Sequence, residues 1–281
     1  IVVTMKSGGG MFSDAGVADL VFRLKERGVN PIVRLTIFQD NVLARTRPDL
    51  ALKNSAGGLW RDGGGGYWMD PASREVWDHN LAIAKEMIHL GFTEINFDYI
   101  RFPSDGDMND IKYPFSEEKV MADPNYGKAE VMRSFFKYLS EEMEDTDAVL
   151  SADLFGMVTT NPDDLNIGQV LEYAEPYFDY LAPMVYPSHY PRGFMGYTNP
   201  NDYPYEIVKY SMEQGVKKLI RASSSPLKLR PWLQDFDYGK DYTVEDITAQ
   251  INATYDAGLT SWFFWDPANR YESLRAYLKN N

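Results

Sequence analysis

The sequence predicts an α/β fold, and within that class a (β/α)8 (TIM) barrel. Apolar runs of strand length alternate with helical patterns along the whole chain, which is typical of parallel βα units. The length of 281 residues matches the roughly 250 residues that one such barrel needs. No linker or low-complexity tract interrupts the pattern. We therefore expect one barrel domain over residues 1–281.

Seven apolar runs predict strands, and each is followed by a helical stretch. The expected strands are residues 1–5, 31–38, 93–102, 149–155, 180–186, 229–236 and 261–265. The expected helices are residues 13–28, 71–90, 128–144, 168–175, 204–222, 243–257 and 270–278. Because a barrel has eight strands and this chain begins inside an apolar run, we expect the first strand to precede residue 1. The chain would then be part of a longer protein.

An open doubly wound sheet is the alternative fold. Such a sheet normally carries a glycine-rich phosphate-binding turn after its first strand. The glycines at residues 8–10 lack the G-x-G-x-x-G spacing of that turn, so the barrel is the favoured prediction.

The composition argues against several classes of function. With 28 Lys and Arg against 41 Asp and Glu, the formal charge is −13, whereas nucleic-acid binding needs clustered positive charge. No apolar run approaches the roughly 20 residues that a membrane span requires. The chain has no cysteine and three histidines, so neither a metal site nor a cofactor is expected. Nothing in the sequence indicates an oligomeric state.

In a TIM barrel the active site lies at the C-terminal ends of the strands. Within residues 91–103, the alternation of a strand places Glu94, Asn96 and Asp98 on one face, which should point into the barrel. Asp98 would be uppermost. Tyr99 falls on the opposite face and is not expected in the site.

Asp153 lies near the end of the next expected strand. Neighbouring strands are about 4.8 Å apart, so Asp98 and Asp153 can face one pocket. Paired carboxylates are what glycosidic cleavage needs, since one donates a proton and the other attacks carbon or activates water. Two structural alternatives stay open: an ion pair between Asp98 and Arg101, and a capping role for Asp153.

Three motifs then identify a family resemblance. They are Phe-Asp-Tyr-Ile-Arg-Phe-Pro at 97–103, Ala-Pro-Met-Val-Tyr-Pro-Ser-His-Tyr at 182–190 and Arg-Pro-Trp-Leu-Gln-Asp-Phe at 230–236. Together they resemble the glycoside hydrolase-like TIM-barrel domain of bacterial, often surface-associated, proteins. The resemblance implies a (β/α)8 fold, a carbohydrate substrate and an extracellular or cell-surface location. One departure concerns the first strand, where Lys6 lacks the acidic neighbours usual in that family.

The residues and the resemblance together predict the site. Glycosidase barrels commonly carry a nucleophilic Asp at the end of the fourth strand, and Asp98 ends the fourth strand when the missing one is counted. We assign Asp98 as nucleophile or base and Asp153 as acid/base, with the roles open to exchange. Arg101 could keep Asp98 ionised. The expected carbohydrate contacts are Asp40, Trp68, Arg101, Tyr186, His189, Arg230, Trp232, Gln234 and Trp265.

Several of these residues also have simple structural explanations. Trp232 could fill the barrel while Arg230 pairs with a buried acid, and His189 could be a hydrogen-bonding loop residue. Trp60 and Trp68 could form an outer rim or pack into the core. Asp105, Asp107 and Asn109 resemble a calcium loop, but the bidentate Glu of such a loop is missing.

The sequence therefore predicts a glycoside hydrolase that acts on an extracellular or cell-wall polysaccharide. The alternative is a carbohydrate-binding barrel without catalytic activity. A barrel lyase or isomerase acting on a phosphorylated metabolite would need basic or glycine-rich phosphate loops after the last strands. The acidic segment 237–241 argues against that third possibility.

Overall fold

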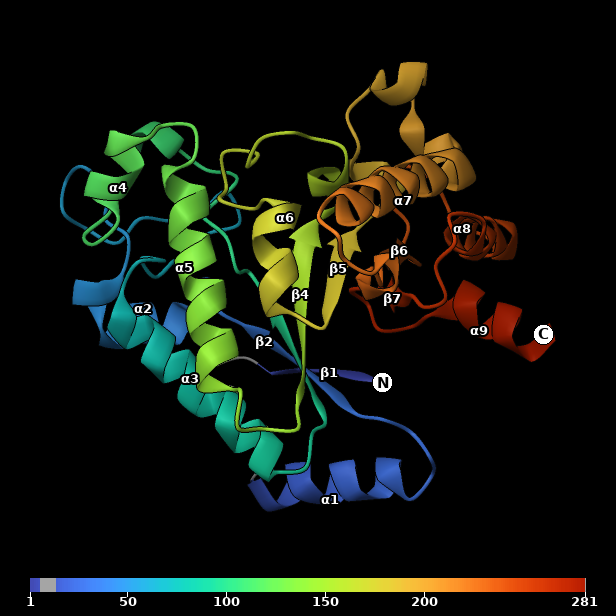
Figure 1. Cartoon of the computed structure of the whole chain (residues 1–281), viewed down its shortest axis with the longest axis horizontal. Coiled ribbons are helices and arrows are strands. Elements are labelled where there is room, and N and C mark those ends of the chain that lie inside the picture. Colours follow the sequence, from blue (N-terminus) through green and yellow to red (C-terminus); the bar gives the residue numbers. More distant parts are fainter. Residues whose placement is uncertain (6–13, 281) are drawn as a thin grey trace. The chain divides into compact units, whose positions relative to one another are not determined.

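The computed structural model describes residues 1–5 and 14–280. The chain divides into two compact units (Figure 1). The first unit comprises Ile1–Asp153 and Asp163–Asp179, and the second comprises Leu154–Pro162 and Tyr180–Asn281. Lys6, the glycines at 8–10 and the expected helix start at Ser13 lie outside the described residues.

The first unit is built on parallel strands that pair in sequence order. They are β1 (Val2–Met5), β2 (Ile32–Thr36), β3 (Glu94–Asp98) and β4 (Val149–Phe155), whose last two residues belong to the second unit. The register pairs Arg34 with Asn96, and Asn96 with Ser151. All five residues of β3 are buried.

Helices connect these strands, as parallel pairing requires. They are α1 (Asp14–Lys25), α2 (Asn41–Thr46), α3 (Arg74–His89), α4 (Glu117–Ala122), α5 (Gly127–Glu142) and α6 (Leu171–Ala174). Helices α3 and α5 run next to each other (Figure 1), and the Trp77 and Phe135 rings meet between them with centroids 5.5 Å apart. Phe135 also meets Phe38, the second residue after β2, at 4.9 Å. Aromatic packing thus joins the helices to the strand layer.

The second unit has its own parallel strands and helices. The strands are β5 (Tyr180–Met184), β6 (Trp232–Gln234) and β7 (Phe263–Trp265), and the helices are α7 (Pro204–Arg221), α8 (Val244–Asp256) and α9 (Glu272–Asn280). Met184 pairs with Trp232, and Gln234 pairs with Trp265. Thr243 begins α8 with a capping box, because its hydroxyl accepts the N–H of Asp246 while the Asp246 carboxylate accepts the N–H of Thr243.

The predicted α/β class is confirmed. The described residues contain seven strands that alternate with helices, and the strands within each of the two units pair in parallel. An eighth strand is not among these residues, so a complete (β/α)8 barrel remains a proposal.

Three boundaries differ from the prediction, and two of the differences have an identifiable local cause. The third strand ends at Asp98 rather than near residue 102, because Tyr99 adopts a left-handed conformation with φ of 53°. Helix α3 begins at Arg74 rather than at 71, because Asp70 accepts the N–H of Ala72 in a turn before the helix. The sixth strand is confined to Trp232–Gln234 instead of 229–236.

Two short helices, α2 and α4, were not expected. Their lengths of six residues are too short for a clear apolar period. Within the described residues, none of the helices combines the length and apolar character of a membrane span.

Candidate active site

One face of β2, β3 and β4 carries a row of polar side chains. Glu94, Asn96 and Asp98 share this face in β3, as their alternation predicts, and Ser151 and Asp153 face them from β4. The register pairs Phe97 with Ala152. One step further along the same strands lie Asp98 and Asp153, so the two aspartates occupy neighbouring positions.

Asp98 is buried, and both of its carboxylate oxygens accept hydrogen bonds. Oδ1 accepts the backbone N–H of Tyr99 at 2.7 Å, and Oδ2 accepts Nη2 of Arg34. The side chain of Asp98 is 5% exposed and that of Arg34 is 11% exposed. The ion partner of Asp98 is therefore Arg34 of β2, where the sequence pointed to Arg101.

Asp153 is held by the same guanidinium. Its Oδ2 accepts Nε of Arg34 at 3.3 Å, and its Oδ1 accepts Nδ2 of Asn96 at 2.8 Å. Asp153 lies inside β4, and the 3-10 helix after this strand has Phe155 at its N-cap. Asp153 is therefore not the N-cap of that helix.

Further hydrogen bonds fix the strands beneath the two aspartates. The Ser151 hydroxyl donates to Glu94 at 2.7 Å and accepts Nδ2 of Asn96 at 3.1 Å. Gln169 is fully buried, and its amide donates to the carbonyls of Ile100 and Asp153 at 3.3 Å and 3.2 Å. This amide ties the end of β4 to the segment after β3, which restricts how far the two carboxylates can separate.

A cavity of about 360 Å³ lies in the first unit, next to the end of β3. Tyr99 connects it to the aspartates, since its N–H binds Asp98 and the residue lines the cavity. The lining residues are Gln39, Asn41, Asp62, Gly64, Gly65, Gly66, Trp68, Tyr99, Arg101 and Asp105. Amides, a guanidinium and aromatic rings suit the hydroxyl groups and apolar faces of a sugar.

Arg101 and Trp68 are brought together at this cavity. The Arg101 guanidinium lies 4.9 Å from the Trp68 ring centroid and 5.1 Å from that of Tyr99. Burial lowers the pKa of Arg101, and the charge of Asp98 opposes that shift. Trp68 is 1% exposed and its indole N–H donates to Asp62 at 2.8 Å, so this ring supports the cavity wall.

Two residues of this site were missed from the sequence. Tyr99 was excluded because strict alternation turns it away, and its left-handed backbone ends that alternation. Arg34 was overlooked although a detectable signal exists, because it is a charged residue inside the apolar run 31–38. A buried arginine needs a carboxylate partner, so its presence predicts one nearby.

Other loop residues turn out to have structural contacts. Asp40 caps α2, where Oδ1 accepts the N–H groups of Val42 and Leu43, both at 2.8 Å. Trp60 is 2% exposed, and its indole N–H donates to the carbonyl of Asp107 at 3.0 Å. Trp60 is therefore a core residue and not an outer rim.

In the second unit, Tyr186 and His189 form part of an aromatic cluster. Their ring centroids are 5.5 Å apart, and Phe236 packs edge-on against both. His189 Nδ1 lies 2.9 Å from the Ser188 hydroxyl, and burial lowers the pKa of the imidazole. His189 therefore favours its neutral form at neutral pH.

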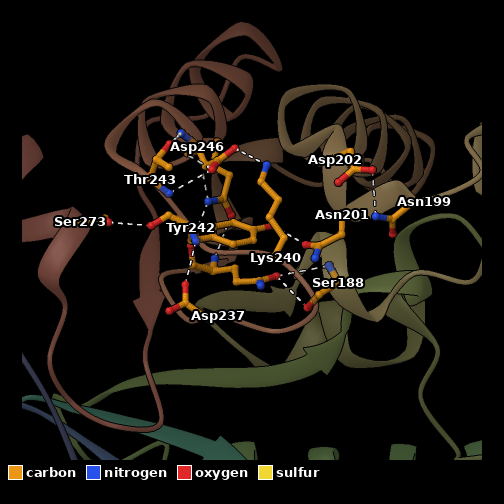
Figure 2. Close-up of polar contacts among 12 residues, drawn as sticks. Ser188, Asn199, Asn201, Asp202, Asp237, Lys240, Tyr242, Thr243, Asp246 and Ser273 are labelled. Atoms are coloured by element: carbon orange, nitrogen blue, oxygen red, sulfur yellow. Dashed lines mark hydrogen bonds and ion pairs between the residues drawn. The ribbon is translucent and has the colours of Figure 1, made fainter.

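Gln234 lies in a buried hydrogen-bond network beside this cluster. Its Oε1 accepts the Ser188 hydroxyl at 2.9 Å, and its Nε2 donates to the carbonyl of Phe236 at 2.9 Å. Figure 2 shows the surrounding network, in which the Tyr242 hydroxyl donates to Asn201 at 2.9 Å. Gln234 is fully buried and uses both ends of its amide inside the protein.

The remaining predicted sugar contacts, Arg230, Trp232 and Trp265, pack against aromatic rings of the second unit. The Arg230 guanidinium lies 3.5 Å from the Tyr180 ring centroid and 4.8 Å from that of Phe263. Trp232 is 3% exposed and packs against Phe263 at 4.5 Å and Trp265 at 6.0 Å. Trp265 is the more accessible of the two tryptophans.

Two aspartates follow the ends of β6 and β7 and line a small cavity of about 60 Å³. Burial raises the pKa of Asp235 to about 6, and the neighbouring charges of Asp266, Asp237 and Glu272 add to this shift. Burial acts the same way on Asp266, but three backbone N–H groups from residues 268–271 together lower its pKa. The two carboxyl groups therefore favour opposite protonation states near pH 5.

This pKa predicts a pH-dependent stability. An unfolded Asp ionises near 3.8, whereas folded Asp235 ionises near 6. The proton on Asp235 therefore stabilises the folded state. This contribution to the free energy of unfolding is complete below about pH 4 and is lost as the pH rises through 6. Asp235→Asn should raise the free energy of unfolding by about 1–2 kcal/mol at pH 8 and by almost nothing at pH 4. Urea unfolding at both pH values measures this change in the free energy of unfolding, and Asp145→Asn at an exposed position is the control. Equal effects of Asp235→Asn at both pH values would contradict the prediction.

Metal-binding geometry is not seen in the described ranges, where no group of three or more His, Asp or Glu side chains could hold an ion. In the loop that resembled a calcium site, Asp105 accepts the N–H of Gly63 and Asp107 accepts the N–H of Asn109. These carboxylates thus stabilise the loop itself.

A family model described as "Putative glycosyl hydrolase domain" matches residues 8–271. The chain belongs to this glycosyl hydrolase family. No curated protein sequence matches it.

Solved structures show the same fold. The glycoside hydrolase domain of PgaB (BpsB) from Bordetella bronchiseptica has a TM-score of 0.60 at 17% identity, covering 92% of this chain and 78% of that one. The PelA glycoside hydrolase domain from Pseudomonas aeruginosa gives 0.54 at 14% identity, covering 95% and 87%. The spore cortex-lytic enzyme SleL from Bacillus megaterium gives 0.57 at 14%, covering 94% and 62%. The fold is therefore shared with glycoside hydrolases of very different sequence.

Proposed function

We propose that this chain hydrolyses glycosidic bonds of an extracellular or cell-wall polysaccharide, with Asp98 as nucleophile or base and Asp153 as acid/base. One observation supports this most strongly. Asp98 and Asp153 occupy neighbouring positions on adjacent strands, and both accept hydrogen bonds from the guanidinium of Arg34. They lie beside a cavity lined by Tyr99 and Arg101. Membership of a glycosyl hydrolase family supports the reaction class.

The proposed reaction needs two carboxyl groups and one water molecule. The acid donates its proton to the glycosidic oxygen as the C–O bond breaks, and the other carboxylate attacks the anomeric carbon or takes a proton from water. If Asp98 attacks the anomeric carbon, water then displaces it: the bond from Asp98 to carbon breaks, the hydroxyl of water bonds to that carbon, and the water proton restores Asp153. If Asp98 acts as base, it takes the proton of the attacking water, and exchange with solvent returns Asp98 to its ionised and Asp153 to its protonated form. No group beyond the two aspartates and water is required by this balance.

The substrate class and location are part of the same proposal. The polar cavity with its aromatic wall supports a carbohydrate, and the resemblance to surface-associated bacterial domains supports an extracellular or cell-surface setting. One structural neighbour is a spore cortex-lytic enzyme, which is compatible with a wall polysaccharide. We also propose that residues 1–281 form one barrel domain completed by an eighth strand.

The test is release of reducing sugar from a panel of bacterial and plant polysaccharides. We expect wild type to release sugar from at least one of them, and Asp153→Asn to reduce that rate by about 10²-fold or more, since general acid catalysis contributes 10²–10⁴-fold. Asp145→Asn, which changes an exposed carboxylate in the same way, should match wild type.

The contrary result is binding without release. If wild type binds a glycan but releases nothing, and Asp153→Asn binds it equally well, the protein is a carbohydrate-binding barrel without activity.

A further inference from the structure

Arg34 occupies an unusual position for an arginine. It is the middle residue of β2, its neighbours Val33 and Leu35 are buried, and its side chain is 11% exposed. Burying a guanidinium in this way is costly unless carboxylates compensate for the lost water. Arg34 lies opposite the two candidate catalytic aspartates, which supply this compensation.

The two arms of the guanidinium reach different carboxylates. Nη2 donates to Asp98 and Nε donates to Asp153 at 3.3 Å. An arginine normally gives both of these groups to one carboxylate as a fork. Here the fork spans two strands, so it fixes the distance between the aspartates and holds each oxygen at a defined angle.

The remaining donors complete the arrangement. Asp98 also accepts the Tyr99 N–H at 2.7 Å, and Asp153 also accepts Asn96 Nδ2 at 2.8 Å. Asn96 is the register partner of Arg34, so both donors to Asp153 come from one rung of the sheet. Each carboxylate oxygen of Asp98 and of Asp153 therefore has a nitrogen donor that holds it in place.

We propose that Arg34 is a positioning residue for glycoside hydrolysis, which sets the spacing and orientation of the Asp98 and Asp153 carboxyl groups. The inference rests on the proposed function, but its structural part can be tested without activity. A purely structural arginine would affect stability alone, whereas this role also lowers kcat while KM stays nearly unchanged.

Two substitutions separate charge from geometry. Arg34→Lys keeps the charge but cannot form the planar fork, so we expect kcat to fall about 10-fold. Arg34→Gln removes the charge as well. We expect its kcat to fall about 10²-fold, since misplacing a catalytic group by about 1 Å costs that much, and KM to stay within about threefold in both variants.

Arg47→Gln is the matched control. Arg47 also bonds to two carboxylates, Asp49 and Glu75, both at 2.8 Å, but this group lies on the surface. Its kcat and KM should equal those of wild type. Wild-type kinetics in Arg34→Gln would overturn the proposal, and so would an unchanged kcat with a raised KM.

Crystal structures of wild type and Arg34→Gln test the inference independently of catalysis. We expect the Asp98 and Asp153 carboxyl groups to lie farther apart in Arg34→Gln than in wild type, and an unchanged separation would overturn the proposal even if the enzyme is active. If no glycan is hydrolysed but the separation increases, the proposed function fails while the positioning role of Arg34 stands. If Arg34→Gln does not fold, Arg34→Gln/Asp153→Asn is compared with Asp153→Asn, which leaves fewer unpaired buried charges.

Discussion

Asp98→Asn is expected to lower kcat on a hydrolysed glycan by about 10³-fold or more. Asparagine has nearly the same shape and can still accept the Tyr99 N–H through its amide oxygen. It carries no negative charge, so it can neither attack the anomeric carbon nor take a proton from water. A 10³-fold loss corresponds to about 4 kcal/mol of lost transition-state stabilisation. Initial rates of reducing-sugar release at saturating glycan measure it.

Two controls make this result specific to the site. Asp145→Asn introduces the same chemical change at an exposed position and should leave kcat unchanged. Circular dichroism and a melting curve should show that Asp98→Asn is folded, because it leaves Arg34 bonded to Asp153. A folded Asp98→Asn variant within tenfold of wild type would remove Asp98 from the mechanism.

Phe135→Ala is expected to lower the free energy of unfolding of the first unit by about 3–5 kcal/mol. Phe135 is fully buried in α5, and its ring contacts Phe38 at 4.9 Å, Trp77 at 5.5 Å and Phe136 at 6.4 Å. Removing the ring leaves a cavity among large aromatic side chains that cannot collapse fully. The midpoint of urea unfolding, followed by tryptophan fluorescence, measures the loss.

The matched control is Phe22→Ala on α1. The Phe22 side chain is 62% exposed, so its removal should change stability by no more than about 0.5 kcal/mol. Similar losses for Phe22→Ala and Phe135→Ala would show that the aromatic cluster of Phe38, Trp77, Phe135 and Phe136 does not stabilise the first unit.

The sequence predicted the order of the strands well, because buried parallel strands are apolar runs that stand out between amphipathic helices. All seven expected runs became strands in the described residues. The alternation also correctly predicted that Glu94, Asn96 and Asp98 share one face, because side chains two residues apart in a strand point the same way.

The contacts within the site were harder to predict. Asp98 was expected beside Arg101, three residues away in sequence, but it bonds to Arg34, which is 64 residues away. No local pattern encodes the register that brings β2 and β3 together. Tyr99 was left out of the predicted site for a different reason. A single left-handed residue at a strand end reverses the expected direction of its side chain.

The residue type alone was a poor predictor of sugar contacts. A polar or aromatic residue at the end of a strand can serve a ligand or the fold, and its type alone does not distinguish the two. Asp40 caps α2, and the Gln234 amide forms hydrogen bonds with Ser188 and Phe236. Asp40 bonds to the start of the helix that follows it, whereas Ser188 is 46 residues from Gln234 and no local pattern predicts that contact.

The most direct test of the central claim is digestion of a responsive glycan in H₂¹⁸O, followed by mass spectrometry of the products. Hydrolysis through Asp98 and Asp153 predicts one ¹⁸O atom at each new reducing end, above the level of a product-only exchange control, and no such product with Asp98→Asn. Cleavage without ¹⁸O, giving an unsaturated sugar lighter by one water, would contradict hydrolysis and identify a lyase.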